Sequence, residues 1–147
     1  MTVELAATDV KIKLEAAIPG CVVEAAGNIV VVKDDSLLKV LTFLKTNPEF
    51  DFNYLNFITA VDYTAYFEIV YYLISIEKNQ LLVVKTRLTD RVKPVLPSVY
   101  GLWKGADFQE REIFDLFGIT FTGHPNLKRI FLWDGFQGYP LRKDFKQ

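Results

Sequence analysis

Residues 52–88 read FNYLNFITAVDYTAYFEIVYYLISIEKNQLLVVKTRL. Three runs in this stretch are rich in the β-branched and aromatic residues that favour strands: 52–61, 66–76 and 81–88. A four-residue turn, Glu77–Gln80, separates the last two runs, and short turns join antiparallel neighbours. The stretch therefore predicts an antiparallel sheet. Within residues 65–71 apolar and polar side chains alternate too loosely to show which face of that strand is buried.

The flanking sequence adds helices and a hairpin. Residues 8–18 and 37–44 carry apolar side chains at helical spacing, and two β-rich runs between them, 21–25 and 29–32, predict a hairpin. A third helix is predicted from Ser98 to Gly118, although Gly101 and Gly105 weaken its first turns. The sequence thus predicts an α+β fold, a mostly antiparallel sheet with about three helices packed on it.

The composition changes after Gly118, where glycine and proline recur too often for a helix. Residues 119–147 hold five basic and two acidic side chains. They also hold six aromatic residues: Phe121, Phe131, Trp133, Phe136, Tyr139 and Phe145. We therefore divide the chain into an α+β domain, 1–118, and an extended C-terminal tail, 119–147. Such a tail must cover its rings with its own domain or with another protein.

Charge and hydropathy exclude several classes of protein. Seventeen basic and eighteen acidic residues leave the whole chain near neutral, which does not favour binding to nucleic acid. The longest apolar stretch, residues 69–76, is far shorter than a membrane-spanning helix requires. The single cysteine, Cys21, cannot alone hold a metal or an iron–sulfur cluster, and its apolar neighbours predict a buried thiol.

The charged run Glu110–Asp115 lies on the predicted third helix. Glu110 falls on the apolar face, where a carboxylate must meet a cation or several hydrogen-bond donors. Arg111 and Asp115 are four residues apart and can pair along the helix. Glu110 and Glu112 point in different directions, so they cannot act together on one bond as an acid–base pair. We interpret the run as a docking network; a solvated helix face is the alternative.

His124 is the only histidine, and neither cysteine nor a second histidine lies near it in the sequence. A metal site or a nucleophilic pair is therefore not supported, and we expect His124 to hydrogen-bond its own loop. The residues supply no other catalytic set. This favours a binding or assembly protein over an enzyme that acts alone.

Two motifs nevertheless carry a specific resemblance. Glu110-Arg111-Glu112 with Asp115, followed by His124-Pro125 and Lys128-Arg129-Ile130, resembles the motif of the thirty-kilodalton subunit of respiratory complex I, in the NADH-quinone oxidoreductase family. The final run GYPLRKDF, residues 138–145, is similar to the same family's tail. One departure lies between the motifs, at Trp133-Asp134-Gly135-Phe136, where many relatives have Pro-Asp-Asp-Trp or a similar sequence.

The resemblance implies a non-catalytic peripheral-arm subunit of a proton-translocating NAD(P)H:quinone oxidoreductase. It implies no cofactor in this chain, with flavin, iron–sulfur clusters and quinone in partner subunits. The implied partners are the quinone-site subunit, which is related to the large subunit of hydrogenases, and the small subunit with the terminal cluster. The implied location is the cytoplasmic, stromal or matrix face of an energy-transducing membrane. An energy-converting hydrogenase or an F420H2 dehydrogenase is the alternative assembly, because the electron donor binds other subunits.

The resemblance also implies which side chains contact partners, through a helix at the base of the tail and a tail that wraps the partner. These residues are Glu110, Arg111, Glu112, Asp115, His124, Pro125, Lys128, Arg129, Trp133, Phe136, Tyr139, Leu141, Arg142, Lys143 and Asp144.

Overall fold

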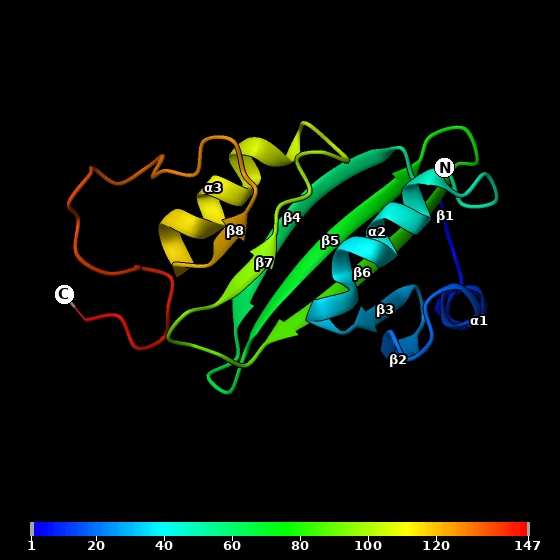
Figure 1. The fold of residues 1–147 in the computed structure, drawn as a ribbon, viewed down its shortest axis with the longest axis horizontal. Coiled ribbons are helices and arrows are strands. Elements are labelled where there is room, and N and C mark those ends of the chain that lie inside the picture. Colours follow the sequence, from blue (N-terminus) through cyan, green and yellow to red (C-terminus); the bar gives the residue numbers. More distant parts are fainter. Residues whose placement is uncertain (1, 147) are drawn as a thin grey trace.

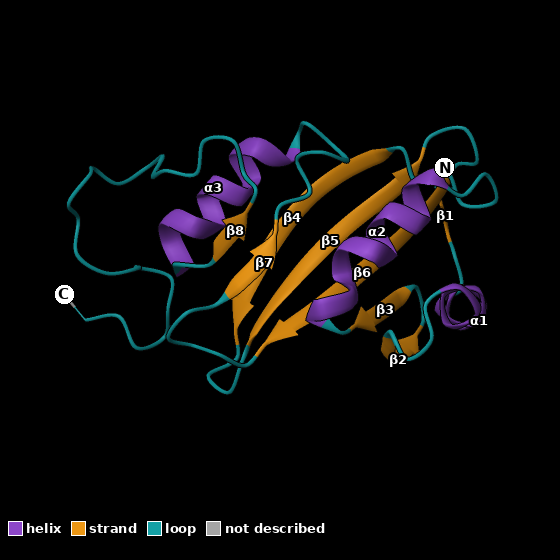
Figure 2. Cartoon of the chain, in the orientation of Figure 1, coloured by secondary structure: helices purple, strands orange, loops and turns teal. Residues whose placement is uncertain are grey.

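A six-stranded sheet forms the centre of the structure, a computed structural model that describes residues 2–146 (Figures 1 and 2). Its strands are β1 (Val3–Glu4), β2 (Val22–Ala26), β3 (Ile29–Val32), β4 (Tyr54–Asp62), β5 (Phe67–Ser75) and β6 (Gln80–Leu88). The main path runs β2-β3-β6-β5-β4, and β1 pairs with β6. Three of the pairings are antiparallel, as predicted, but β3 and β1 both run parallel to β6. A helix and two strands separate β3 from β6, which gives the chain length that a parallel pairing requires.

The central strand β5 shows which face of the sheet is buried. Phe67, Ile69, Tyr71 and Leu73 alternate along it and are fully buried in the core. On the opposite face Glu68 is also nearly buried, because its carboxylate pairs with neighbouring cations on β6. The first half of β5, residues 67–71, is therefore buried on both faces, which explains why its sequence alternates so loosely.

Three helices pack on the sheet: α1 (Ala7–Ala17), α2 (Leu37–Thr46) and α3 (Ala106–Phe117). Figure 1 shows α2 lying across β5 and β6, and a 3-10 turn, η1 (Asp34–Ser36), leads into it. The helix α3 protects the edge of the sheet, because Gln109 Oε1 accepts the N–H of Ile58 on β4 at 2.6 Å. An edge strand without such a partner would expose its backbone groups.

The predicted third helix began too early, since α3 starts at Ala106 and not at Ser98. The chain from Ser98 to Gly105 forms turns, in which the N–H groups of Leu102 and Trp103 both bond to the Val99 carbonyl. Glycines in the first turns of a helix lose more backbone entropy than other residues, and two of them lie here. The end of the helix was predicted correctly at Gly118, which has a φ of 76°.

Residues on both sides of α3 form a small second sheet that the sequence did not predict. The strands β7 (Val95–Pro97) and β8 (Thr120–Thr122) pair in parallel, with Leu96 opposite Phe121. Ile119 and Phe121 are buried in the main core. The start of the predicted tail is therefore built into the domain.

We call residues 123–146 the C-terminal segment. Through Lys146 it contains neither helix nor strand, and in Figure 1 it makes a wide arc beyond α3 before it returns toward the sheet. The contacts of this segment define the candidate site.

Candidate functional site

Glu110 lies fully buried on α3 and meets hydrogen-bond donors, as its place on the apolar face predicted. The Ser98 hydroxyl donates to Oε1 at 2.6 Å, and the Val99 N–H donates to Oε2 at 2.8 Å. Burial raises the pKa of Glu110 above its ordinary value, and these two hydrogen bonds offset only part of that effect. Glu110 therefore anchors the turn before α3 to the helix, although its charge is buried.

We expect Glu110→Gln to be nearly neutral at pH 7–8, because the amide can accept from Val99 and donate to the Ser98 oxygen without burying a charge. Because the folded-state pKa of Glu110 is raised, protonation favours the folded state. Wild type should therefore gain stability relative to the variant as the pH falls through that pKa toward about 4.3, the value for an unfolded chain. Urea unfolding midpoints at pH 8 and pH 5 measure this.

Glu110→Ala serves as the comparison, since it leaves both donors unpaired and should cost about 1–3 kcal/mol at either pH. A Glu110→Gln variant whose stability relative to wild type does not change with pH would contradict the buried-charge assignment.

His124 bonds to its own loop and to α3, and its side chain is fully buried. The Asn126 N–H donates to Nδ1 at 2.9 Å, which leaves the proton on Nε2 in the neutral ring. That nitrogen lies 3.1 Å from both the carbonyl and the Oδ1 of Asp107. The expectation of a loop-bonding histidine is confirmed, and the ring ties the start of the C-terminal segment to the first turn of α3.

Asp115 makes the densest set of contacts and is fully buried. Its Oδ2 accepts three consecutive backbone N–H groups, from Ile130 at 3.1 Å, Phe131 at 2.7 Å and Leu132 at 3.1 Å. Its Oδ1 accepts from Arg129 at 2.9 Å. Burial alone raises the pKa of this carboxyl, but the three N–H groups and the guanidinium outweigh it and hold the pKa below its usual range.

Arg111 does not pair with Asp115, so the helical pairing suggested by their spacing is wrong. Its guanidinium instead donates to the carbonyls of Lys128 at 3.1 Å and Arg129 at 3.2 Å. Arg129, in the C-terminal segment, pairs with Asp115 instead. Its guanidinium also donates hydrogen bonds to the carbonyls of Phe136 and Gly138. Together, Arg111, Asp115 and Arg129 form what we call the first attachment of the C-terminal segment.

A second attachment holds the distal end of the segment at the corner of the main sheet. Asp62, at the end of β4, accepts from Arg91 at 2.7 and 2.9 Å and from the Lys143 N–H at 2.9 Å. The Arg91 guanidinium holds the pKa of Asp62 well below its usual range. Arg142 donates to the carbonyls of Phe117 and Arg91. Asp62 and Arg91 were not predicted as site residues, since no spacing rule connects them to position 143.

Cations and aromatic rings connect the two attachments. The Arg142 guanidinium lies 5.1 Å from the Phe67 ring centroid and 5.0 Å from that of Tyr139. Arg129 lies 5.0 Å from the same Tyr139 ring and 5.6 Å from Phe136. Each such contact stabilises by about 0.5–1 kcal/mol at an exposed site. The tyrosine ring itself packs onto Gly118, where an added Cβ would lie 2.6 Å from it.

The predicted partner-binding residues thus fall into two groups. Eight of them make the intrachain contacts just described through their side chains: Glu110, Arg111, Asp115, His124, Arg129, Phe136, Tyr139 and Arg142. Seven are exposed: Glu112, Pro125, Lys128, Trp133, Leu141, Lys143 and Asp144. Phe136 is half-buried. Two further exposed rings, Phe108 and Phe131, were not among the predicted site residues, although 60% and 62% of their surfaces are accessible.

We call the exposed group, together with Phe108 and Phe131, the candidate docking surface. Large apolar side chains exposed in this number are typical of surfaces that bind other proteins. The group with intrachain contacts positions this surface, because each of its charges bonds to a backbone group or a countercharge of the same chain.

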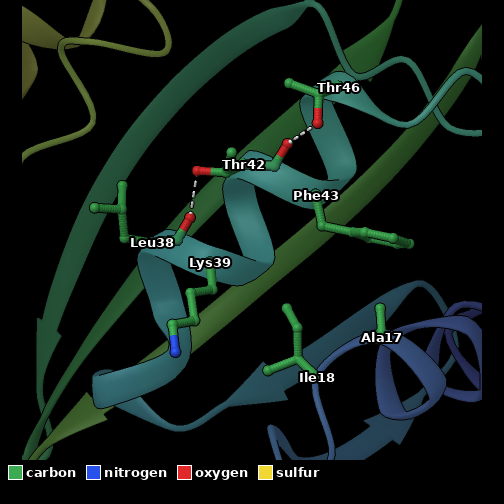
Figure 3. Close-up of a pocket in the computed structure, with 7 residues that line it drawn as sticks. All are labelled: Ala17, Ile18, Leu38, Lys39, Thr42, Phe43 and Thr46. Atoms are coloured by element: carbon green, nitrogen blue, oxygen red, sulfur yellow. Dashed lines mark hydrogen bonds between the residues drawn. The ribbon is translucent and has the colours of Figure 1, made fainter.

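An open groove of about 470 Å³ lies between the end of α1 and α2, away from the C-terminal segment (Figure 3). It holds one charged side chain, Lys39, and the hydroxyls of Thr42 and Thr46 bond back to carbonyls of their own helix. No acid–base pair lines it. Within residues 2–146 no cluster of three potential metal ligands occurs, and no helix is long and apolar enough to cross a membrane.

A similar fold occurs in one chain of a respiratory membrane complex. The fold of this protein is similar to a chain in the structure of the membrane-bound sulfane sulfur reductase (MBS), an archaeal respiratory membrane complex, with a TM-score of 0.76 and 27% sequence identity over 95% of this chain and 85% of that one. Residues 30–147 match the family described as respiratory-chain NADH dehydrogenase, 30 Kd subunit. The chain belongs to this family.

Relatives support this assignment along most of the chain. A subunit of the NADH-quinone oxidoreductase from Roseiflexus sp. (strain RS-1) is 42% identical over 90% of this chain and 79% of its own length. The corresponding subunit from Moorella thermoacetica is 48% identical over 79% of this chain and 78% of its length. Other relatives are longer: the chain spans 64% of a subunit of the same enzyme from Rhizobium etli and 41% of the 30.4 kDa mitochondrial subunit of Neurospora crassa. The resemblance inferred from the two motifs is confirmed.

Proposed function

We propose that this chain is a non-catalytic assembly subunit of a complex I-type proton-translocating NAD(P)H:quinone oxidoreductase. In this proposal the candidate docking surface binds the quinone-site subunit, which is related to the large subunit of hydrogenases. The small subunit with the terminal cluster lies nearby. The chain sits peripherally on the cytoplasmic, stromal or matrix face of the membrane.

The arrangement of the C-terminal segment carries the proposal. Both ends of the segment are fixed to the domain, at Asp115 and at Asp62, while Trp133, Leu141 and Lys128 between or beside them face solvent. A segment ordered before binding loses less conformational entropy when it meets its partner. Exposed aromatic rings such as Trp133 and Phe131 are of the residue type that is enriched at protein interfaces.

We also propose that redox cofactors lie in the partners. The chain has one cysteine, which is buried in the core, and iron–sulfur clusters need several thiolates. The electron donor is then a property of the other subunits. A second candidate in the same class is an equivalent subunit of an energy-converting hydrogenase or an F420H2 dehydrogenase, and the similarity to a chain of an archaeal sulfane sulfur reductase supports only the wider class of respiratory membrane complexes.

The test is affinity capture of the tagged chain from membranes of its native cells, with the captured proteins identified by mass spectrometry. We expect a hydrogenase-like subunit and cluster-bearing subunits at equal stoichiometry. The double variant Lys128→Glu, Leu141→Asp should reduce their recovery at least about fivefold, because it places charge on two exposed positions of the surface.

A matched control makes the same two changes on α1 and α2, as Lys39→Glu with Ile12→Asp. Both of these side chains are exposed, and their replacement should leave recovery unchanged. Capture of the tagged wild-type chain without other subunits would refute the proposed function.

A further inference from the structure

The C-terminal segment contains a hollow that lies outside the two attachments. It has a volume of about 610 Å³, and we call it the aromatic hollow. It is lined by Trp133, Phe136, Gln137, Pro140, Phe145 and Lys146. Trp133 meets Phe136 edge to face, with 84° between the rings, and Phe136 stacks on Phe145 at 6.2 Å. These rings therefore form adjoining walls of one apolar cup.

The backbone shapes the walls of the hollow. Gly135 and Gly138 both have a φ of 92°, a conformation that residues with a Cβ rarely adopt. A Cβ at Gly135 would lie 3.0 Å from the Trp133 ring, and a Cβ at Gly138 would lie 3.0 Å from the Phe145 ring. The two glycines thus let the rings lie against the main chain. Arg129, which donates to Asp115, also packs its guanidinium against the Phe136 ring.

The charge around the hollow is basic. Among the described residues that line it, Lys146 is the one with a charged side chain. Within the described part of the chain, Lys146 and its neighbour Lys143 take part in no ion pair, whereas Arg129 is already paired to Asp115. The region from 119 to 147 carries five basic and two acidic side chains. A partner that fills the hollow would meet the positive charge of Lys146 at its rim.

We propose that the aromatic hollow receives one large apolar side chain from an acidic segment of the partner subunit, with a carboxylate of that segment paired to Lys146. This inference rests on the proposed function and names the part of the surface that anchors the partner. A side chain of leucine, methionine or phenylalanine would be enclosed by aromatic walls, which is the geometry of an interface hot spot. A concave site favours a protruding protein side chain over a membrane, because insertion into lipid requires rings that project.

The first test repeats the capture experiment with Trp133→Ala and Phe145→Ala. Each change removes a wall of the hollow, and we expect recovery of the complex to fall at least about tenfold. The matched control is Tyr54→Ala, which removes an exposed ring on β4 that neither lines the hollow nor belongs to the candidate docking surface, and should change recovery less than about twofold. All three rings lie outside the hydrophobic core, so thermal melting of the isolated variants should match that of wild type.

The second test uses a photo-reactive phenylalanine analogue at Gln137, which lines the hollow. Illumination of the native complex should link this position to a segment of another subunit that has an apolar residue flanked by Asp or Glu. Lys146→Glu should weaken capture and Lys146→Gln should do so less. A crosslink to lipid, or to a second copy of this chain, would overturn the proposal.

The outcomes separate this proposal from the one on which it rests. If the wild-type chain captures the complex and Trp133→Ala and Phe145→Ala capture it equally well, the aromatic hollow is not the anchor and the proposed function stands. If the wild-type chain captures no other subunit, the proposed function fails, and the partner of the hollow fails with it.

Discussion

Replacing Asp115 with alanine should release the first attachment and raise hydrogen exchange at the amides of Ile130, Phe131 and Leu132 by about 100-fold or more. In the wild-type protein these three N–H groups share one buried carboxylate oxygen, and Arg129 holds the other. Removing one member of a buried ion pair costs about 3–5 kcal/mol, because the remaining charge stays without compensation. Exchange followed by mass spectrometry measures the effect directly.

The same substitution should lower the melting temperature less than the full cost suggests. The C-terminal segment can leave α3 and take its unpaired donors into water, while the sheet and its helices stay folded. Glu112→Ala is the control, since it removes an exposed carboxylate from the same helix and should leave exchange at residues 130–132 unchanged. Exchange in Asp115→Ala that equals wild type would show that this carboxylate does not hold the segment.

Gly118→Ala should destabilise the protein by about 2–4 kcal/mol. A non-glycine residue at a φ of 76° costs roughly 1–2 kcal/mol. The new Cβ would also lie 2.6 Å from the Tyr139 ring, which must then move away from Arg129 and Arg142. Each lost cation–π contact adds about 0.5–1 kcal/mol. Chemical denaturation of the purified variant measures the sum.

A double-mutant cycle isolates the contribution of the ring. In a Tyr139→Ala background the contact at Gly118 is absent, so Gly118→Ala should cost only its backbone strain. Gly101→Ala is the matched control, because a Cβ there meets nothing within 4 Å, and it should change stability by less than about 0.5 kcal/mol. Equal costs of Gly118→Ala in both backgrounds would exclude the close packing of Tyr139.

The main sheet could be predicted because its evidence is local. The strands at 54–62, 67–75 and 80–88 follow from β-rich runs joined by short turns. The parallel pairings of β1 and β3 with β6 could not be predicted, since they join segments about 50 or more residues apart. The small β7–β8 sheet was missed because its strands have only three residues each and a helix lies between them in the chain.

The sequence predicted the burial of a site residue where its position on α3 determines it. It did not predict the contacts that α3 makes with residues outside the helix. Burial of Glu110 followed from its register on α3, but its partners Ser98 and Val99 lie in turns that were assigned to the helix. The spacing of Arg111 and Asp115 suggested a pair, because spacing rules apply only to neighbours on the same helix. Asp115 instead meets Arg129, fourteen positions later. The partner-binding role of the predicted residues stays a prediction.

The place of β6 in the sheet has a consequence for biosynthesis. This strand pairs with β5 on one side and with both β1 and β3 on the other, yet it follows all three in the chain. Until residue 88 leaves the ribosome, β6 is incomplete and the edges of β1 and β3 that pair with it stay unpaired. The nascent polypeptide therefore cannot complete its core. Collapse of the N-terminal half should therefore wait for synthesis of more than half the chain, which makes the emerging β3 edge the region where a chaperone is most needed.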